Sequence, residues 1–298
     1  MSLQAELLRF GIRIFLRRRA HQQFDLGKLR SAMRRMEKLV PAPPRRCQTV
    51  TLNVGDLVVH RVTTPESRND RHVLYLHGGA YVSGSPRHYR HFTWRLADAF
   101  KAHIWLLGYR LAPEHPYPAA LDDAEAVYDW LIGTTPEDRQ LLMMGDSAGG
   151  GLTLGLLLKL RDDNKPLPKA AMALSPWTDL ALTGASLRSN ASTDPMLNAD
   201  DLPELAQYYL AGADPRTPYA SPLYGDTSGL PPVLIHVGGD EILLDDAVRM
   251  AQKLRRHNSQ SKVEVWPRMP HVWHLFAPVL PEARQAIAAI AEFVAEAA

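Results

Sequence analysis

The 298-residue sequence contains a single cysteine, Cys47, so no disulfide bond can form within the chain. This scarcity of cysteine is typical of a reducing compartment and favours a cytoplasmic location. No segment approaches about 18 consecutive apolar residues, which a membrane-spanning helix would need. The N-terminus also lacks the apolar run and small-residue cleavage site of a secretory signal. We therefore expect no stable membrane insertion.

Net charge is also low, at +2, which is too small to indicate nucleic acid as a partner. It is unevenly distributed, because residues 1–40 hold ten Lys or Arg against three Asp or Glu, a net charge of +7. Residues 4–19 and Leu26–Leu39 both have helical patterns, and the prolines of 41–44 end the second. Two interpretations are open: a solvated face on helices that cover the protein, or an anchor in a membrane interface. The short, interrupted apolar face of 4–19 favours the first.

Eight short apolar runs bounded by turn residues predict eight strands. These runs are Thr49–Val54, Leu57–Val62, Val73–His77, Ile104–Leu107, Leu141–Met144, Ala170–Leu174, Val233–Val237 and Val263–Trp266. Helical patterns separate most of them, including Ala119–Leu131, Leu152–Leu160, Asp246–Arg256 and Pro281–Ala297. An antiparallel pair leading into alternating strands and helices predicts a mostly parallel sheet with helices on both faces. Pro195–Leu210 interrupts the alternation and predicts an insertion that joins the N-terminal helices over the sheet.

The segment Gly145-Asp146-Ser147-Ala148-Gly149 fits the pattern G-x-S-x-G. A predicted strand precedes it and a predicted helix follows it, as in the sharp turn that exposes a nucleophilic serine. A Cβ at either glycine would collide with the crossing strand or helix. The hydroxyl is a weak nucleophile alone, so it needs a base, a group that orients the base, and donors for an oxyanion.

Donors for an oxyanion are predicted after an early strand, in His77-Gly78-Gly79-Ala80. Successive glycines allow backbone N–H groups to point at one spot. The N–H of Ala148, directly after the serine, would add a further donor. An ordinary glycine turn would explain Gly78-Gly79 alone, but the order relative to Ser147 favours an oxyanion hole.

The acid and base should follow the serine in the order Asp or Glu, then His. Asp240 follows the strand Val233–Val237, and His271 follows the strand Val263–Trp266. Since the carboxyl ends of neighbouring strands meet at one edge of a sheet, these side chains could touch. The alternatives are Asp245 and Asp246, which fall on the next predicted helix, and His274. His236 lies within a strand and is expected to be buried structure.

With these residues in place, the chain resembles the bacterial hormone-sensitive-lipase-like (family IV) esterases of the α/β-hydrolase fold. The resemblance runs from about residue 70 to the C-terminus. Besides the three motifs above, it includes Tyr109–Pro116, Ser175-Pro176-Trp177, Gly239–Leu243 and Met269-Pro270-His271. Three positions depart from the usual pattern: Ala80 replaces a third glycine, Gly151 replaces an asparagine, and Asp240-Glu241-Ile242 replaces Asp-Pro-Leu. The last change keeps the carboxylate of Asp240.

The resemblance implies Ser147 as nucleophile, His271 as base and then acid, and Asp240 as its orienting carboxylate. It implies an oxyanion hole of Gly78, Gly79 and Ala148, with Tyr109, Arg110 and Asp146 as supports. The expected fold is an eight-stranded sheet with a helical cap. Residues 1–45 would form a cap segment and 46–298 the catalytic domain, with about 186–212 contributing to the cap. The expected substrates are small-molecule carboxylic esters with short to medium acyl chains, hydrolysed without a cofactor or metal.

Other functions remain open at this stage. Plant gibberellin receptors resemble the family and only bind a ligand, but the predicted presence of all three triad residues favours catalysis here. Amide hydrolysis would use the same residues, and only a comparison of turnover separates it from ester hydrolysis. A metal enzyme is disfavoured because His88 and His91 lack an H-E-x-x-H motif or paired carboxylates. The last strand is a candidate sheet edge and makes a homodimer possible.

Overall fold

The computed structural model describes residues 2–17, 24–135 and 140–297. Its central feature is an eight-stranded sheet in the order β1-β2-β4-β3-β5-β6-β7-β8. The strands are β1 (Gln48–Val54), β2 (Leu57–Thr63), β3 (Arg71–Leu76), β4 (His103–Gly108), β5 (Gln140–Asp146), β6 (Ala171–Leu174), β7 (Val233–Gly238) and β8 (Lys262–Trp266). β1 and β2 are antiparallel to their neighbours, and β4, β3 and β5 to β8 run parallel. All eight predicted strands are confirmed, with ends that shift by at most two residues.

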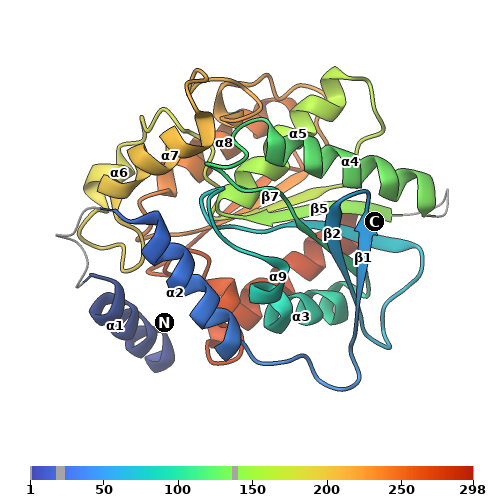
Figure 1. The fold of residues 1–298 in the computed structure, drawn as a ribbon, viewed down its shortest axis with the longest axis horizontal. Coiled ribbons are helices and arrows are strands. Elements are labelled where there is room, and N and C mark those ends of the chain that lie inside the picture. The colour runs from blue at the N-terminus through green and yellow to red at the C-terminus, as the bar shows by residue number, and fades with distance from the viewer. Residues whose placement is uncertain (1, 18–23, 136–139, 298) are drawn as a thin grey trace.

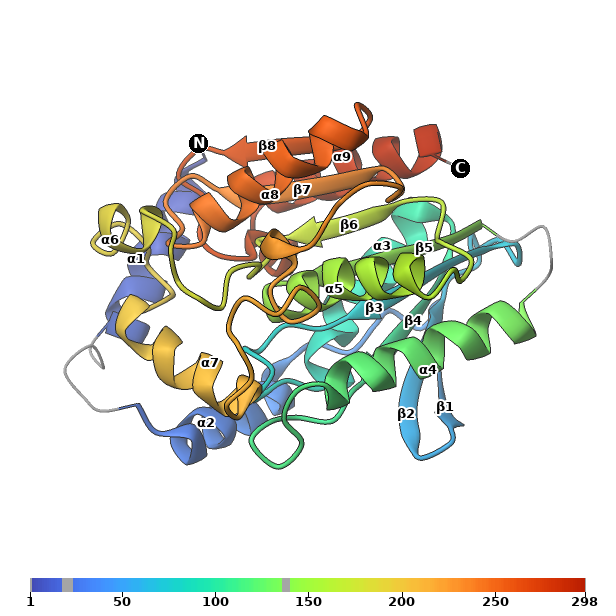
Figure 2. The ribbon, with the colours of Figure 1, turned by 90° about the horizontal axis from the view of Figure 1, so that it is seen from above.

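Helices cover both faces of this sheet (Figures 1 and 2). On one face lie α4 (Ala119–Thr134), α5 (Ala148–Asp162) and α8 (Leu244–His257), and on the other α3 (Arg90–Phe100) and α9 (Pro281–Ala297). Each face has its own apolar core, and these two cores account for the fold because their side chains alternate along the buried strands. The predicted α/β-hydrolase fold is thus confirmed.

The helix predictions are less complete than the strand predictions. The crossover helix α3 was not identified, although Phe92, Leu96 and Phe100 repeat every four residues and are fully buried in it. The helix after Ser147 begins at Ala148, one turn earlier than predicted, because three glycines there weaken the helical pattern. In the insertion, α7 begins at Leu202 and ends at Leu210, a shorter helix than the pattern suggested.

A helical cap lies at the carboxyl ends of the parallel strands, on the left of Figure 2. It combines α1 (Leu3–Arg17) and α2 (Leu26–Leu39) with α6 (Ser186–Ser189) and α7. The solvated face predicted for 4–19 is more apolar than expected, since Leu7 and Phe10 are 63% and 65% exposed. Within the described ranges, no helix is both long and apolar enough to cross a bilayer.

The edges of the sheet are β1 and β8, so the predicted edge position of the last strand is confirmed. Val265 on β8 is 44% exposed. An exposed edge can pair with a second chain, but pairing into a homodimer stays a prediction.

Candidate active site

Ser147 occupies the sharp turn between β5 and α5. Its backbone has a φ of 54° and a ψ of −123°, a strained conformation for a residue with a side chain. The flanking glycines make this turn possible, as predicted. A Cβ on Gly145 would lie 2.2 Å from the carbonyl oxygen of Gly149, and one on Gly149 would lie 2.1 Å from that of Leu76. The strand, turn and helix are therefore in backbone contact around the serine.

The serine hydroxyl lies against the imidazole of His271. Ser147 Oγ is 2.9 Å from His271 Nε2, and His271 Nδ1 is 2.7 Å from Glu241 Oε2. A neutral imidazole with its proton on Nδ1 satisfies both bonds: it donates to the carboxylate and accepts from the hydroxyl. A hydroxyl, an imidazole and a carboxylate thus touch in series, which is the arrangement of a catalytic triad.

The structure corrects the predicted carboxylate. Asp240 does not contact His271; its carboxylate forms an ion pair with Arg9 of α1. The tight turn after β7, in which the N–H of Glu241 donates to the carbonyl of Gly238 (3.2 Å), directs the next side chain to the histidine instead. Asp240 and Glu241 are adjacent in the sequence, and the resemblance to the family indicated Asp240. Glu241 is fully buried in the structure, but no signal in the sequence distinguished it from Asp240.

Glu241 has a partner for each carboxylate oxygen. While Oε2 bonds to His271, Oε1 accepts from the Ser175 hydroxyl (2.7 Å) and the Gly238 N–H (2.5 Å). The same Ser175 hydroxyl oxygen accepts from the N–H of Val272 (3.2 Å), directly after the histidine. These bonds satisfy a carboxylate with no exposed surface and fix its orientation toward the imidazole.

Burial and charge act in opposite directions on His271. Burial, the largest influence, disfavours the imidazolium, but the carboxylates of Glu241, Asp194 and Asp146 favour it. The carboxylates prevail, and the pKa of His271 lies above its ordinary value of 6.5. A raised pKa makes the imidazole a stronger base, which suits a group that must remove a proton from a serine hydroxyl.

The predicted oxyanion donor Gly78 is also corrected. Its N–H lies 3.0 Å from Asp146 Oδ1 and 2.9 Å from the Tyr89 hydroxyl, so it is already occupied. Asp146 accepts further bonds from the hydroxyls of Tyr75 (2.8 Å) and Tyr89 (2.9 Å). Burial raises the pKa of Asp146 to about 6, against the lowering effect of these bonds. Asp146 is thus the support that the resemblance implied.

Three other N–H groups near Ser147 are candidates for an oxyanion hole. Gly79 and Ala80 have φ angles of 120° and 53° and directly follow Gly78, where an added Cβ would lie 3.1 Å from the Cβ of Ser147. Ala148 is the first residue of α5 and its N–H has no intrahelical acceptor. Ala80 replaces Gly78 as a candidate donor, because a backbone N–H group can donate a hydrogen bond whatever the side chain of its residue.

The neighbouring histidines have structural roles. His274 Nε2 lies 3.1 Å from Nδ1 of the fully buried His236, away from the serine, so His271 rather than His274 contacts Ser147. His88 Nε2 lies 2.8 Å from the carbonyl oxygen of Met33, and His91 Nε2 lies 2.8 Å from the carbonyl oxygen of Leu275. In the described part of the chain, no cluster of three His, Cys, Asp or Glu could hold a metal ion.

Aromatic side chains from α7 and from the segments that follow β3 and β6 are in contact beside the nucleophile. Tyr209 of α7 stacks on Tyr81 with ring centroids 3.6 Å apart, and Tyr81 lies near Trp177. The backbone N–H of Trp177 donates to the carbonyl of Ser147 (3.0 Å). All three rings are buried. They also explain Gly151, because a Cβ there would lie 2.9 Å from the Tyr81 hydroxyl and 2.2 Å from the Trp177 carbonyl oxygen.

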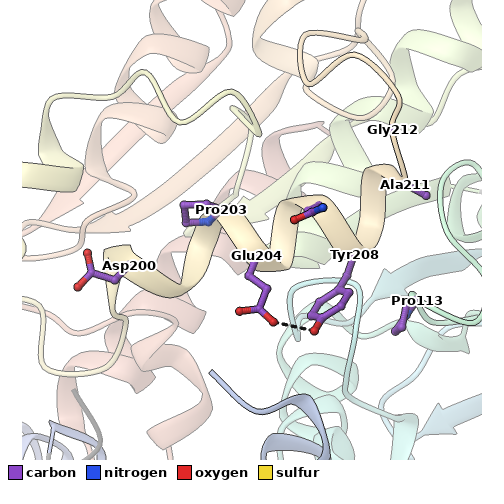
Figure 3. Close-up of a pocket in the computed structure, with 8 residues that line it drawn as sticks. Pro113, Asp200, Pro203, Glu204, Tyr208, Ala211 and Gly212 are labelled. Atoms are coloured by element: carbon purple, nitrogen blue, oxygen red, sulfur yellow. Dashed lines mark hydrogen bonds between the residues drawn. The ribbon is translucent and has the colours of Figure 1, made fainter. Parts of the chain in front are cut away.

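The other face of α7 borders an open groove of about 690 Å³ that does not contain the triad (Figure 3). The groove is lined by Pro113, Asp200, Pro203, Glu204, Gln207, Tyr208, Ala211 and Gly212. In Figure 3 the hydroxyl of Tyr208 donates to Glu204 (2.7 Å). The two adjacent tyrosines therefore lie in different environments: Tyr208 faces the outer groove, and Tyr209 packs inward.

The cap helix α2 holds the loop that carries Gly79 and Ala80. Arg30 Nε donates to the carbonyl of Val82 (2.8 Å), and its Nη2 donates to the carbonyl of Ala112 (2.7 Å). The same guanidinium forms a two-pronged ion pair with Glu114 (2.6 and 2.7 Å). Nothing in the sequence singled out Arg30, because its partners lie far along the chain.

Comparison with known proteins agrees with this fold and site. Residues 73–275 match the α/β-hydrolase fold family, so the chain is an α/β hydrolase. An acetyl-hydrolase of Streptomyces hygroscopicus is 46% identical over 230 residues, which cover 77% of each chain. An esterase of Acinetobacter venetianus is 36% identical over 222 residues, 74% of this chain and 73% of its own.

Solved structures narrow the assignment. The crystal structure of an esterase from the bacterial hormone-sensitive lipase family is 41% identical, with a TM-score of 0.91 over 99% of this chain and 98% of its own. EstE5, solved after soaking with p-nitrophenyl butyrate, is 38% identical with a TM-score of 0.93, over 100% and 99% of the two chains. The chain belongs to the bacterial hormone-sensitive-lipase family of esterases, as the resemblance implied.

Proposed function

We propose that this protein is a carboxylesterase that forms an acyl-enzyme on Ser147, with His271 as base and Glu241 as its orienting carboxylate. The observation that carries the proposal is the unbroken contact from Ser147 Oγ to His271 and from His271 to Glu241. The names of the relatives, acetyl-hydrolase and esterase, support the same reaction. Asp240 has no part in this triad.

Acylation begins when His271 Nε2 takes the proton from Ser147 Oγ as the oxygen attacks the carbonyl carbon of the ester. The carbonyl oxygen becomes an oxyanion. Its proposed donors are the N–H groups of Gly79, Ala80 and Ala148. The bond to the alcohol oxygen then breaks, and His271 returns the proton to the leaving alkoxide. Removing one donor in such a site costs about 10²–10³ in rate.

Deacylation repeats the cycle with water. His271 removes a proton from the water as its oxygen attacks the acyl carbon, and the imidazolium then protonates Ser147 Oγ as the ester bond breaks. Glu241 keeps the imidazole proton on Nδ1 in both halves and stabilises the imidazolium that forms in each. The products are a carboxylic acid and an alcohol, and the chain's own residues move every proton.

Short to medium acyl chains are the proposed substrates. The stacked rings of Tyr81 and Tyr209 and the neighbouring Trp177, whose N–H donates to the carbonyl of Ser147, support this proposal. The proposal also keeps the division into a cap segment, residues 1–45 with about 186–212, and a catalytic domain of 46–298. A cytoplasmic location, the absence of a cofactor and a homodimer stay predictions.

The test is hydrolysis of p-nitrophenyl esters from acetyl to palmitoyl, with Ser147→Ala as the control. We expect a maximum between butanoyl and octanoyl esters, little turnover of palmitoyl esters, and a loss of several orders of magnitude in Ser147→Ala. Amides of the same acids should react much more slowly. Highest activity on emulsified long-chain triglyceride would contradict the chain-length proposal, and full activity in Ser147→Ala would contradict the mechanism.

A further inference from the structure

An arginine of the first cap helix contacts both loops that carry the acid and the base. Arg9 Nη1 donates to the carbonyl oxygen of Arg268 (2.6 Å), and its Nη2 pairs with the carboxylate of Asp240. Arg268 lies three residues before His271, and Asp240 directly precedes Glu241. The side chains of Arg9 and Asp240 are only 14% and 18% exposed, so the pair is largely shielded from water.

The two loops are also in direct backbone contact. The N–H of Gly239 donates to the carbonyl of Trp266 (2.9 Å), and a Cβ on Gly238 would lie 2.1 Å from the carbonyl oxygen of Met269. Arg268 has a φ of 58°, so the histidine loop adopts a left-handed conformation at the residue that Arg9 holds. The distance between Glu241 and His271 therefore depends on how these two loops are held together.

The helix that carries Arg9 is itself attached to the body of the protein. Glu6 pairs with the Arg268 side chain (3.0 Å), and Ser2 donates from its N–H and its hydroxyl to Glu282 of α9 (2.5 and 2.8 Å). Arg9 thus extends from an anchored helix. A guanidinium presents several donors in a rigid plane, so it can bridge a carbonyl and a carboxylate on different loops.

We propose that Arg9 is a positioning residue for the triad: it clamps the acid loop to the histidine loop from the cap and so maintains the contact between Glu241 and His271. This inference rests on the proposed function. It also gives Asp240 a role as the anchor of the clamp. Arg9 contacts none of the reacting atoms, so its effect should fall on the rate of chemistry more than on substrate binding.

The experiment compares Arg9→Met with Arg13→Met, an exposed arginine one turn further along the same helix. With p-nitrophenyl butyrate, we expect Arg9→Met to lower kcat about tenfold with KM within about twofold, since small misplacements of catalytic groups reduce rate strongly. Arg13→Met should match the wild type in both. Arg9→Lys keeps the charge but not the planar fork, and should recover part of the loss. Asp240→Asn tests the other half of the clamp, and in combination with Arg9→Met it should add little further loss.

A second readout does not depend on turnover. Amide hydrogen exchange in residues 238–241 and 266–271 should be faster in Arg9→Met than in Arg13→Met, because the two loops lose a shared partner. If Arg9→Met does not fold, Arg9→Lys and Asp240→Asn are compared with Arg13→Met in its place. Unchanged kcat and unchanged exchange in the Arg9 and Asp240 variants would overturn the clamp while leaving the esterase proposal intact. A wild-type protein without ester turnover would overturn the esterase proposal, and faster loop exchange in Arg9→Met would then still show that Arg9 joins the loops.

Discussion

The sheet and the cap hold the active site in different ways. Around Ser147 the support is backbone against backbone, with glycines at 145 and 149 where a Cβ would lie 2.1–2.2 Å from a carbonyl oxygen. In the cap the support comes from two arginine side chains, Arg9 and Arg30, which bind carbonyl groups of the loops around the site. The sheet therefore fixes the nucleophile within one short motif. The position of the remaining groups depends on residues far away in the sequence.

One added methyl group should disrupt the backbone packing around Ser147. Gly149→Ala would place its Cβ 2.1 Å from the carbonyl oxygen of Leu76 and 2.4 Å from that of His77. Since neither backbone can move without disturbing the sheet, we expect a loss of about 3 kcal/mol or more in the free energy of unfolding. Urea unfolding measures it.

Gly133→Ala is the matched control for that substitution. Gly133 is also helical, in α4, but nothing lies within 4 Å of its added Cβ. It should stabilise the protein by roughly 0.5–1 kcal/mol, because alanine is the better helix former. Equal effects of the two substitutions would show that the backbone contact at Gly149 is not the reason for its glycine.

The loss of activity at low pH tests the electrostatic environment of His271 and its partner Glu241. Because only neutral His271 can accept the serine proton, kcat/KM should rise with pH and level off above the pKa of His271. The neighbouring carboxylates place that pKa above 6.5, so the midpoint should lie above 6.5. A midpoint at about 6 would instead point to the buried carboxyl of Asp146.

The smallest expected effect comes from the cap contact to the oxyanion loop. Arg30→Met removes donors to Val82 and Ala112 and an ion pair that is partly exposed to water. A pair of this kind is worth about 1 kcal/mol at most, so kcat/KM for p-nitrophenyl butyrate should fall only about fivefold. Arg34→Met, one turn along α2 and exposed, should leave it unchanged. A loss of several hundredfold in Arg30→Met would mean that the cap is as decisive as the sheet.

The same contrast explains how much could be predicted from the sequence. The contact between Ser147 and His271 was predictable, because the first residue lies in a motif whose glycines have a steric purpose and the second follows a strand. The predicted Asp240 was wrong, since adjacent carboxylates differ only in the direction that a tight turn gives them. Gly78 was wrong as a donor because its N–H is occupied by Asp146, a partner from another strand.

The contacts of Arg9 had no signal in the sequence. Its carbonyl partner on Arg268 lies 259 positions further along the chain. A guanidinium that binds a backbone oxygen needs no particular residue type at the other end, so no pattern marks the pair. Periodicity likewise indicated α1, α2 and α7 but could not show which loops they contact.

The central claim is that Glu241, and not its neighbour Asp240, orients the catalytic histidine. The most direct measurement is kcat/KM for p-nitrophenyl butyrate in Glu241→Gln and Asp240→Asn, with folding checked by circular dichroism. We predict a loss of about 10³–10⁴ in Glu241→Gln, the size seen when a triad carboxylate becomes an amide, and a loss of no more than about tenfold in Asp240→Asn. A large loss in Asp240→Asn beside a nearly active Glu241→Gln would contradict the account.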